Sequence, residues 1–218
     1  LDPVSGVITG TIHYSASVGG PYSVTITATD PWGGQTSQSF VWNIANLAPL
    51  TQGESATVSE STIVSGNVLI NDSDPDGDSL SVSAVGGVPA NVGSGVSGTG
   101  GGLFTIHSNG NYTFNPDSDF EDLGPGQSRT TSISYTVSDA DGATSIATIV
   151  ITVTGNNDAP VVTNPIATQN GTGLEGVSLN VSSHFSDADI TDVLTYSANN
   201  LPPGLSINPV TGLITGTI

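Results

Sequence analysis

The chain has 218 residues and a formal net charge of −18, from nineteen acidic side chains and one basic one, and it contains no cysteine. This charge excludes nucleic acid and anionic membrane surfaces as partners, because binding to phosphate needs clustered Lys and Arg, and it predicts cations as partners instead. Disulfides cannot cross-link the chain, no apolar run approaches the roughly 20 residues of a membrane span, and Leu1 opens no signal peptide, so we expect a segment excised from a longer protein.

Short segments of alternating apolar and polar residues run along most of the chain. In chain order they cover residues 24–28, 40–44, 104–106, 112–114, 133–137 and 149–153. This period-two alternation is typical of strands, and Gly, Asn, Asp and Pro separate the runs about every ten residues. Asn109-Gly110 predicts a tight primed hairpin turn, since Asn-Gly accepts positive φ. The pattern predicts an all-β sandwich architecture.

Internal repeats divide the chain. Residues 1–12 match residues 207–218 with eight identities in twelve, and at an offset near 110 the hairpin of Asp30 matches that of Asp139. Two related domain types therefore alternate. We expect residues 1–46 to be the C-terminal half of one domain, residues 51–155 a complete domain, and residues 160–218 the N-terminal half of a domain of the first type. Because each half lacks its natural strand partners, we expect head-to-tail self-association between neighbouring molecules.

Acidic residues form two matching groups, each with a glutamate, an aspartate triplet and an aspartate at a hairpin turn. The first group is Glu60, Asp74, Asp76, Asp78 and Asp139. The second group is Glu175, Asp187, Asp189, Asp192 and Asp30. The same three parts recur in both domain types, and the sequence leaves open which of these carboxylates share one ion.

Calcium is the metal that such clusters favour. Two carboxylates about 4 Å apart repel by roughly 4 kcal/mol at an effective dielectric near 20, and a single Arg cannot neutralise them. Ca²⁺ accepts six to eight oxygen ligands, whereas Mg²⁺ prefers a smaller octahedral shell and zinc or copper would need clustered His or Cys. Residues 72–77 begin like an EF-hand loop, but Ser83 stands where a bidentate Glu is required. The alternative is a solvated Asp-Gly turn.

The motifs resemble those of a known family. Residues 160–218 followed by 1–46 resemble a dystroglycan-type cadherin-like domain, through the sequences at 185–189, 201–207 and 211–216. Residues 51–159 are similar to VCBS-type cadherin-like repeats of large bacterial surface adhesins, through the sequences at 68–72, 109–112 and 135–139. The resemblance implies tandem immunoglobulin-like or cadherin-like Greek-key β-sandwiches at the bacterial cell surface, outside the cell.

The same resemblance implies where calcium binds. Asn157-Asp158-Ala-Pro160 resembles the linker that joins cadherin domains through shared calcium, so Asn157 and Asp158 join the candidate metal ligands. At the other junction Leu47 takes the place of Asp158, so we expect that junction to be looser or metal-free. Glu60, Asp74, Asp76, Asp139, Glu175, Asp187, Asp189 and Asp30 match family calcium positions.

Three classes of function compete. The first is a calcium-rigidified extender of a secreted adhesin, serving cell adhesion or biofilm formation, with neighbouring repeats as its partners. The second is polysaccharide binding, indicated by Trp32 beside Asp30 in a turn, where an exposed indole can stack on a sugar. An enzyme finds no support, since no nucleophile has an identifiable base and no acid pair has a recognisable pocket, so we expect neither catalytic nor cofactor-binding residues besides the calcium ligands.

Overall fold

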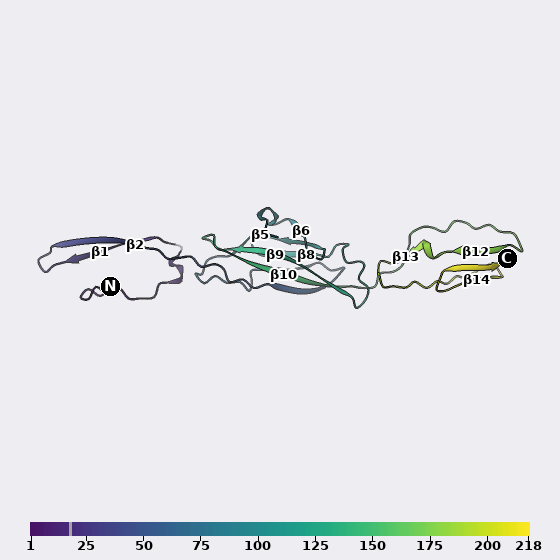
Figure 1. The fold of residues 1–218 in the computed structure, drawn as a ribbon, viewed down its shortest axis with the longest axis horizontal. Helices are drawn as coiled ribbons and strands as arrows, with labels where there is room; N and C mark the ends of the chain where they lie inside the picture. The colour runs from purple at the N-terminus through teal and green to yellow at the C-terminus, as the bar shows by residue number, and fades with distance from the viewer. Residues whose placement is uncertain (18) are drawn as a thin grey trace.

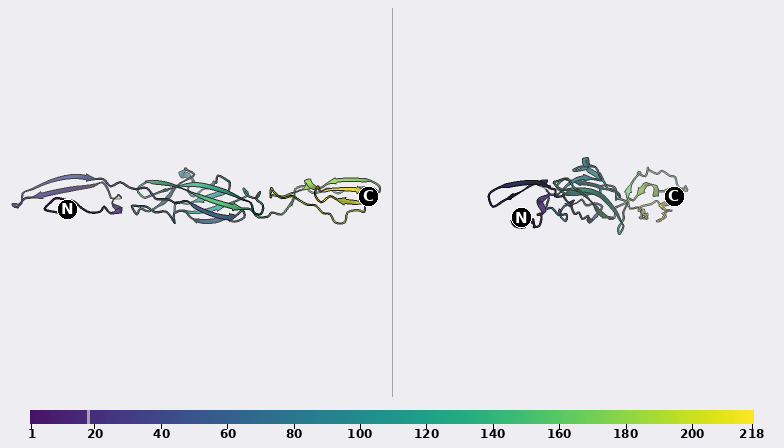
Figure 2. Two further views of the ribbon diagram at one scale, coloured as in Figure 1. Left: turned by 60° about the horizontal axis from the view of Figure 1, so that its bottom comes forward. Right: turned by 60° about the vertical axis from the view of Figure 1, so that its left-hand side comes forward.

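The computed structural model describes residues 1–17 and 19–218. In the described residues the secondary structure is strands and three short 3-10 helices. Three parts follow one another along a single long axis, with residues 1–46 at one end and residues 160–218 at the other (Figure 1). The same order appears from two further directions (Figure 2). No helix among the described residues has the length and apolar character that crossing a membrane would require.

The central part is a sandwich of two four-stranded sheets. The first sheet has the order β3-β10-β9-β5 and the second the order β4-β8-β7-β6. Its strands are β3 (Glu54–Ser59), β4 (Val64–Asn67), β5 (Ser81–Val85), β6 (Gly95–Ser97), β7 (Leu103–Ile106), β8 (Asn111–Asn115), β9 (Ser128–Ser138) and β10 (Thr144–Thr154), with a 3-10 helix η2 (Pro89–Asn91). β3 runs parallel to β10, and the other pairs are antiparallel.

The core lies between these two sheets. Alternation places every second residue of β9 and β10 inside, where Tyr135, Ile149 and Ile151 are fully buried. The opposite sheet contributes Phe104 and Phe114, whose ring centroids lie 4.6 Å apart. The apolar alternation predicted for residues 133–137 and 149–153 is confirmed in these two long strands, which also fix the positions of the turns at either end of the sandwich.

The turn at Asn109-Gly110 differs from the predicted primed turn. Gly110 has φ 83°, but Asn109 is not among the residues with positive φ. Gly110 N–H donates to the carbonyl of His107, and His107 N–H donates to the carbonyl of Asn111, each at 2.9 Å. The loop is therefore one residue longer, a three-residue connection with a left-handed glycine at its end. The predicted hairpin itself is present as β7 and β8.

The two outer parts each contain fewer strands. The N-terminal part has a 3-10 helix η1 (Tyr14–Ala16) and one hairpin, β1 (Tyr22–Thr29) with β2 (Gln35–Trp42). The C-terminal part has β11 (Val161–Val162), β12 (Gly176–Asn180), η3 (Ser182–His184), β13 (Phe185–Ser186), β14 (Leu205–Ile207) and β15 (Leu213–Thr217). Its sheets have the orders β11-β13 and β12-β15-β14. The predicted strand at 40–44 ends at Trp42, so Ile44 lies beyond it.

Candidate metal centres

The first acidic centre lies where the N-terminal part meets the central sandwich. We call it the first junction cluster, made of Asn46, Asp74, Asp76, Asp78 and Asp139. Asp139 begins the β9–β10 turn, where its Oδ1 accepts hydrogen bonds from three successive backbone N–H groups and its Oδ2 accepts one from Asn46 Nδ2 at 2.9 Å. Asp76, in the loop before β5, accepts a hydrogen bond from the N–H of Leu47 at 2.6 Å. The linker therefore docks on these carboxylates.

The second acidic centre lies where the central sandwich meets the C-terminal part. We call it the second junction cluster, made of Glu60, Asp158, Asp187, Asp189 and Asp192. One oxygen from each of the last three carboxylates lies within 4.8 Å of the other two. Asp189 Oδ2 accepts a hydrogen bond from the N–H of Asp158 at 3.0 Å, and Glu60 Oε1 accepts one from the N–H of Asn156 at 2.5 Å. The cluster thus contains groups from both sides of the junction.

The two junctions share one local geometry. In the first, Asp76 N–H donates to Asp74 Oδ1 at 2.8 Å while Asp76 Oδ2 receives a linker N–H. In the second, Asp189 N–H donates to Asp187 Oδ1 at 3.1 Å while Asp189 Oδ2 receives a linker N–H. This agreement arises because an Asp-x-Asp sequence closes the same turn on itself in both places. The carboxylate oxygens of both clusters that accept none of these hydrogen bonds have no donor from the protein.

Several of those remaining oxygens are buried with no hydrogen-bond partner. In the first junction cluster they are Asn46 Oδ1, Asp74 Oδ2 and Asp78 Oδ2. In the second they are Glu60 Oε2, Asp158 Oδ2 and Asp189 Oδ1. Glu60 is only 5% exposed and Asp189 only 2%. A buried carboxylate oxygen without a donor is costly, and a donor set of oxygens alone fits Ca²⁺ rather than zinc or copper.

The local electrostatics also disfavour bare carboxylates here. Burial raises the pKa of Glu60, and the carboxylates of Asp158, Glu121 and Asp189 raise it further, against the hydrogen bond from Asn156. Burial likewise raises the pKa of Asp78, with added repulsion from Asp141, Asp74, Asp139 and Asp76. A divalent cation among these groups would reverse both effects, because it favours the charged form.

The structure separates acidic residues that the sequence places in one group. Glu60 does not gather with Asp74 and Asp139, because it follows β3 and hydrogen-bonds through its N–H to Thr154 at the far end of β10. Asp139 precedes the opposite end of that eleven-residue strand, roughly 35 Å away at about 3.3 Å per residue. Glu60 therefore lies at the junction after the central sandwich, whereas Asp74 and Asp76 lie at the junction before it.

Two other candidate ligands, Glu175 and Asp30, also lie far from the aspartates with which the sequence groups them. Glu175 is exposed at the distal end of the C-terminal part, where its Oε2 accepts a hydrogen bond from Thr172 N–H at 3.0 Å. Asp30 is exposed at the tip of the β1–β2 hairpin, where its Oδ1 accepts N–H groups of Trp32 and Gly34. Neither meets Asp187, Asp189 or Asp192. Asn157 is exposed beside the second junction cluster, with its Nδ2 donating to the carbonyl of Asp158 at 2.7 Å.

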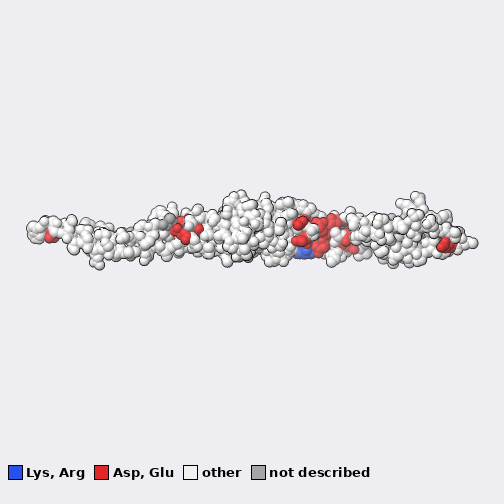
Figure 3. Space-filling view, turned by 90° about the horizontal axis from the view of Figure 1, so that it is seen from above, with Lys and Arg blue, Asp and Glu red and all other residues white. Residues whose placement is uncertain are grey.

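Sequence reasoning missed two acidic residues that lie at the second junction. Glu121 raises the pKa of Glu60 through its charge, and the carbonyl of Asp122 accepts the N–H of Ile190 at 3.3 Å. Arg129, the chain's single basic residue, pairs with Asp122. Figure 3 shows the broadest red patch at this junction, with the blue guanidinium beside it. Their position before β9 and near Glu60 could be found only with the sheet topology known.

A third acidic pair lies inside the central sandwich, near the start of β3. Tyr135 hydroxyl donates to Glu54 Oε2 at 2.5 Å, and Asp72 Oδ1 accepts the N–H of Gln52 at 2.8 Å. Glu54 Oε1 and Asp72 Oδ2 are buried without partners. Burial raises the pKa of both carboxyl groups, and the charge of Asp72 adds to the effect on Glu54. Asp72 thus belongs with Glu54, apart from its sequence neighbours Asp74 and Asp76.

Replacing Glu54 with Gln should raise the free energy of unfolding, measured in chelator at neutral pH, on the order of 1 kcal/mol, because it removes a buried charge. Because the pKa of Glu54 is raised in the folded state, this carboxyl group stabilises the fold below its unfolded-state pKa of about 4.3. That contribution is lost as pH rises through the folded-state pKa. Urea midpoints of the wild type should therefore fall from about pH 4.5 to 7 more steeply than those of Glu54→Gln. Glu175→Gln, at an exposed site, is the control. Equal slopes for wild type and Glu54→Gln would contradict the prediction.

The fold and the paired junctions define a class of protein: all-β modules of the immunoglobulin-like and cadherin-like type, built as sandwiches joined end to end. The chain belongs to the bacterial cadherin-like domain family, whose model matches residues 46–155. A second family model, described as "Putative Ig domain", matches residues 1–45 and 159–218. Cadherin-like domains are typically extracellular repeats of the adhesion type and in general are not enzymes. No curated protein matches the sequence.

Solved structures of cadherin repeats are similar to this chain. A protocadherin gammaB7 EC3-6 cis-dimer structure is 18% identical, with 91% of this chain and 51% of that one covered at a TM-score of 0.42. Mouse cadherin-23 EC22-24 is 18% identical, and the match covers 89% of this chain and 62% of that one at a TM-score of 0.45. A nucleoside hydrolase-related hypothetical protein from Saccharophagus degradans, associated with carbohydrate metabolism, is 20% identical. That match covers 50% of this chain and 26% of the other at a TM-score of 0.31. The chain spans less than two thirds of each.

Proposed function

We propose that this chain is a calcium-rigidified extender of a bacterial cell-surface adhesin, acting outside the cell in adhesion or biofilm formation. The observation that carries the proposal is the second junction cluster, where buried, unpartnered oxygens of Glu60 and Asp158 accompany that of Asp189. Glu60 belongs to the central sandwich and Asp189 to the part that follows it, with Asp158 in the linker between them. One ion held by all three would restrict rotation between successive modules.

The free oxygens of these residues support the proposal, because the hydrogen bonds already present would not have to be given up when an ion binds. Glu60, Asp158 and Asp189 each keep one oxygen free while the other oxygen or the backbone already fixes the side chain or linker. Asp187 and Asp192 bring further carboxylates within reach of Asp189. When bound, the ion supplies charge neutralisation and a cross-link in a chain that has no cysteine. The linker's freedom would then depend on the calcium concentration.

The first junction cluster supports a second, weaker ion site. Its ligands would be Asp74, Asp76, Asp78, Asp139 and the side-chain oxygen of Asn46. It has no linker carboxylate, because Leu47 stands where Asp158 stands at the other junction. With fewer charged ligands we expect lower affinity there. The prediction of a looser first junction therefore remains a prediction, to be measured separately from the second.

Distances between spin labels across the second junction test the proposal. Labels at Thr148→Cys on β10 and Ser206→Cys on β14 occupy exposed positions on either side. We expect a narrow distance distribution with calcium and a much broader one with chelator. Asp189→Asn should keep the distribution broad in calcium, whereas Asp2→Asn, an equal charge change in an exposed turn, should not. Distance distributions of equal width in calcium and in chelator would contradict the proposed mechanical role.

Carbohydrate binding is the second candidate, favoured by one observation. Trp32 is 91% exposed at the tip of the β1–β2 hairpin, next to Asp30. An exposed indole can stack on a sugar face. Trp42, by contrast, lies on the inner face of the hairpin with Phe40, their ring centroids 6.2 Å apart. Binding of soluble polysaccharides by the wild type and its loss in Trp32→Ala would support this function over a purely mechanical one.

A further inference from the structure

The β8–β9 loop, residues 116–127, is anchored in the central sandwich at the second junction. Its Phe120 and Leu123 side chains are buried in the core. Gly124 N–H donates to Gln127 Oε1 at 2.9 Å, and the carbonyl of Gln127 accepts the N–H of Gly155 at 3.1 Å. The loop therefore has a position fixed by its own module, independent of the module that follows.

Arg129 holds the same loop at three points. Its Nη1 donates to the carbonyl of Asp119 at 2.9 Å, and its Nη2 donates to the carboxylate of Asp122 at 2.5 Å. The guanidinium carbon lies 5.5 Å from the centroid of the Phe120 ring. The side chains of Arg129 and Asp122 are 37% and 43% exposed, so the ion pair by itself contributes little stability. Its planar fork instead fixes where the segment from Asp119 to Asp122 lies.

The outer face of this loop contacts the next module. The carbonyl of Asp122 accepts the N–H of Ile190 at 3.3 Å. Apart from its chain neighbours, the three atoms nearest to a Cβ at Gly124 would be Thr191 Oγ1 at 3.3 Å and the Cβ and Cγ of Asp189, both at 3.6 Å. All three belong to the C-terminal part. The space that a side chain at position 124 would occupy is therefore filled by the following module.

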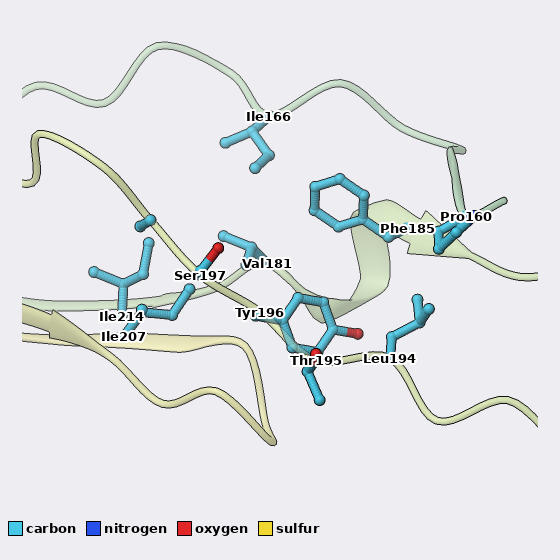
Figure 4. A pocket seen from close by; sticks show the side chains of 11 residues that line it. Pro160, Ile166, Val181, Phe185, Leu194, Thr195, Tyr196, Ser197, Ile207 and Ile214 are labelled. Atoms are coloured by element: carbon cyan, nitrogen blue, oxygen red, sulfur yellow. The ribbon is translucent and has the colours of Figure 1, made fainter.

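The opposite side of the contact is anchored as well. Phe185, two residues before Asp187, faces an apolar cavity of the C-terminal part. Figure 4 shows its ring beside Tyr196, with ring centroids 6.2 Å apart, and Pro160 of the linker at the same cavity. The loop that carries the aspartates of the second junction cluster is thus attached to its own module. The contact joins two surfaces that are each positioned independently.

The first junction contains an equivalent contact. Tyr14 stands 16 residues before the turn residue Asp30, as Leu123 of the β8–β9 loop stands 16 residues before Asp139. A Cβ at Gly77 would lie 2.6 Å from Cε2 of the Tyr14 ring, so the ring lies directly on the acidic loop before β5. In both junctions the loop before the long hairpin of one module therefore meets the Asp-x-Asp loop of the next.

We propose that the β8–β9 loop is a docking surface for residues 187–192 that needs no ion, and that Gly124 and Arg129 are positioning residues of the second junction. The docked loop holds Asp189 near Glu60 before calcium arrives. Less freedom is then lost when an ion binds, which raises the affinity. The effect on calcium affinity rests on the proposed function, whereas the docking itself does not.

A side chain at position 124 tests the docking. Gly124→Leu should separate the two loops while leaving the core of the central sandwich intact. With the label pair Thr148→Cys/Ser206→Cys, we expect a broader distance distribution than that of the wild type in chelator. The calcium concentration that half-narrows the distribution should rise roughly tenfold, as for other residues that orient metal ligands. Gly176→Leu is the control, because no atom beyond its chain neighbours lies within 4 Å of that position.

A second variant tests the role of Arg129. Arg129→Lys keeps the charge but cannot donate to the carbonyl of Asp119 and the carboxylate of Asp122 in one planar fork. We expect the same changes as for Gly124→Leu, in chelator width and in calcium midpoint. The urea midpoint of Gly124→Leu in chelator should equal that of the wild type. A lower urea midpoint would contradict the proposal, because it would place the wedge inside the central sandwich.

The outcomes separate the docking from the calcium function. If both variants match the wild type in chelator width and in calcium midpoint, the docking is overturned, and narrowing by calcium would still support the mechanical role. If the wild type is equally narrow in calcium and in chelator while Gly124→Leu is broad in both, the docking is supported and the calcium function is contradicted.

Discussion

Calcium should raise the free energy of unfolding by about 2.7 kcal/mol when its free concentration is one hundred times the dissociation constant. The reason is that the proposed ion would bind carboxylates that only the folded chain gathers, among them the buried Glu60 and Asp189. The measurement is thermal unfolding by calorimetry at neutral pH, in calcium and in chelator. We expect an upward shift of several degrees with calcium, reversed when chelator is added.

The pH dependence of this effect has a definite sign. The pKa of Glu60 is raised in the folded, metal-free chain, so this group stabilises the fold at low pH and that contribution is lost as pH rises. Calcium needs the deprotonated carboxylate, so its stabilising effect should grow over the same rise in pH. The difference between the melting temperatures in calcium and in chelator should therefore increase from acidic to neutral pH.

A matched pair of variants isolates the junction. Glu60→Gln keeps an oxygen for the N–H of Asn156 but removes a charged ligand, so it should lose most of the calcium-dependent shift while melting no lower than the wild type in chelator. Glu175→Gln makes the same change at an exposed site and should behave as the wild type. Identical melting of all three proteins in calcium and in chelator would contradict the role of the second junction cluster.

Ile149→Ala should destabilise the central sandwich by about 2–5 kcal/mol, the cost of an unfilled cavity in a packed core. Ile149 is fully buried on β10, in the core cluster that also contains Phe104 and Phe114 of the opposite sheet. Urea unfolding in chelator measures the change. Phe40→Ala, at the equivalent position of β2, should alter the unfolding midpoint of the dilute chain by no more than about 0.5 kcal/mol, because Phe40 is already 40% exposed.

The two variants contrast a fully buried position with one that is 40% exposed. A large loss of stability for Phe40→Ala in dilute chain would contradict the exposed position. A negligible loss for Ile149→Ala would contradict the buried core.

Much of the local structure could be predicted from the sequence. The alternation of apolar residues in 133–137 and 149–153 is a direct consequence of one buried sheet face, and β9 and β10 follow it. The Asp-x-Asp turns at 74–76 and 187–189 could also be recognised, since each closes through a hydrogen bond two residues apart. The length of the turn at Asn109-Gly110 could not, because one extra loop residue leaves the strand pattern unchanged.

The all-β pattern, the matching acidic motifs and the repeat of related modules could be read from the chain, because these depend on neighbouring residues and fixed spacings. Which carboxylates meet became known from the folded arrangement alone. Glu60 lies 14 residues before Asp74 along the chain, yet β3 carries it to the opposite end of the sandwich, where it joins Asp189 instead. Contacts across a junction depend on where each strand ends, and a strand's direction in the sheet is set by its partners rather than by its own residues.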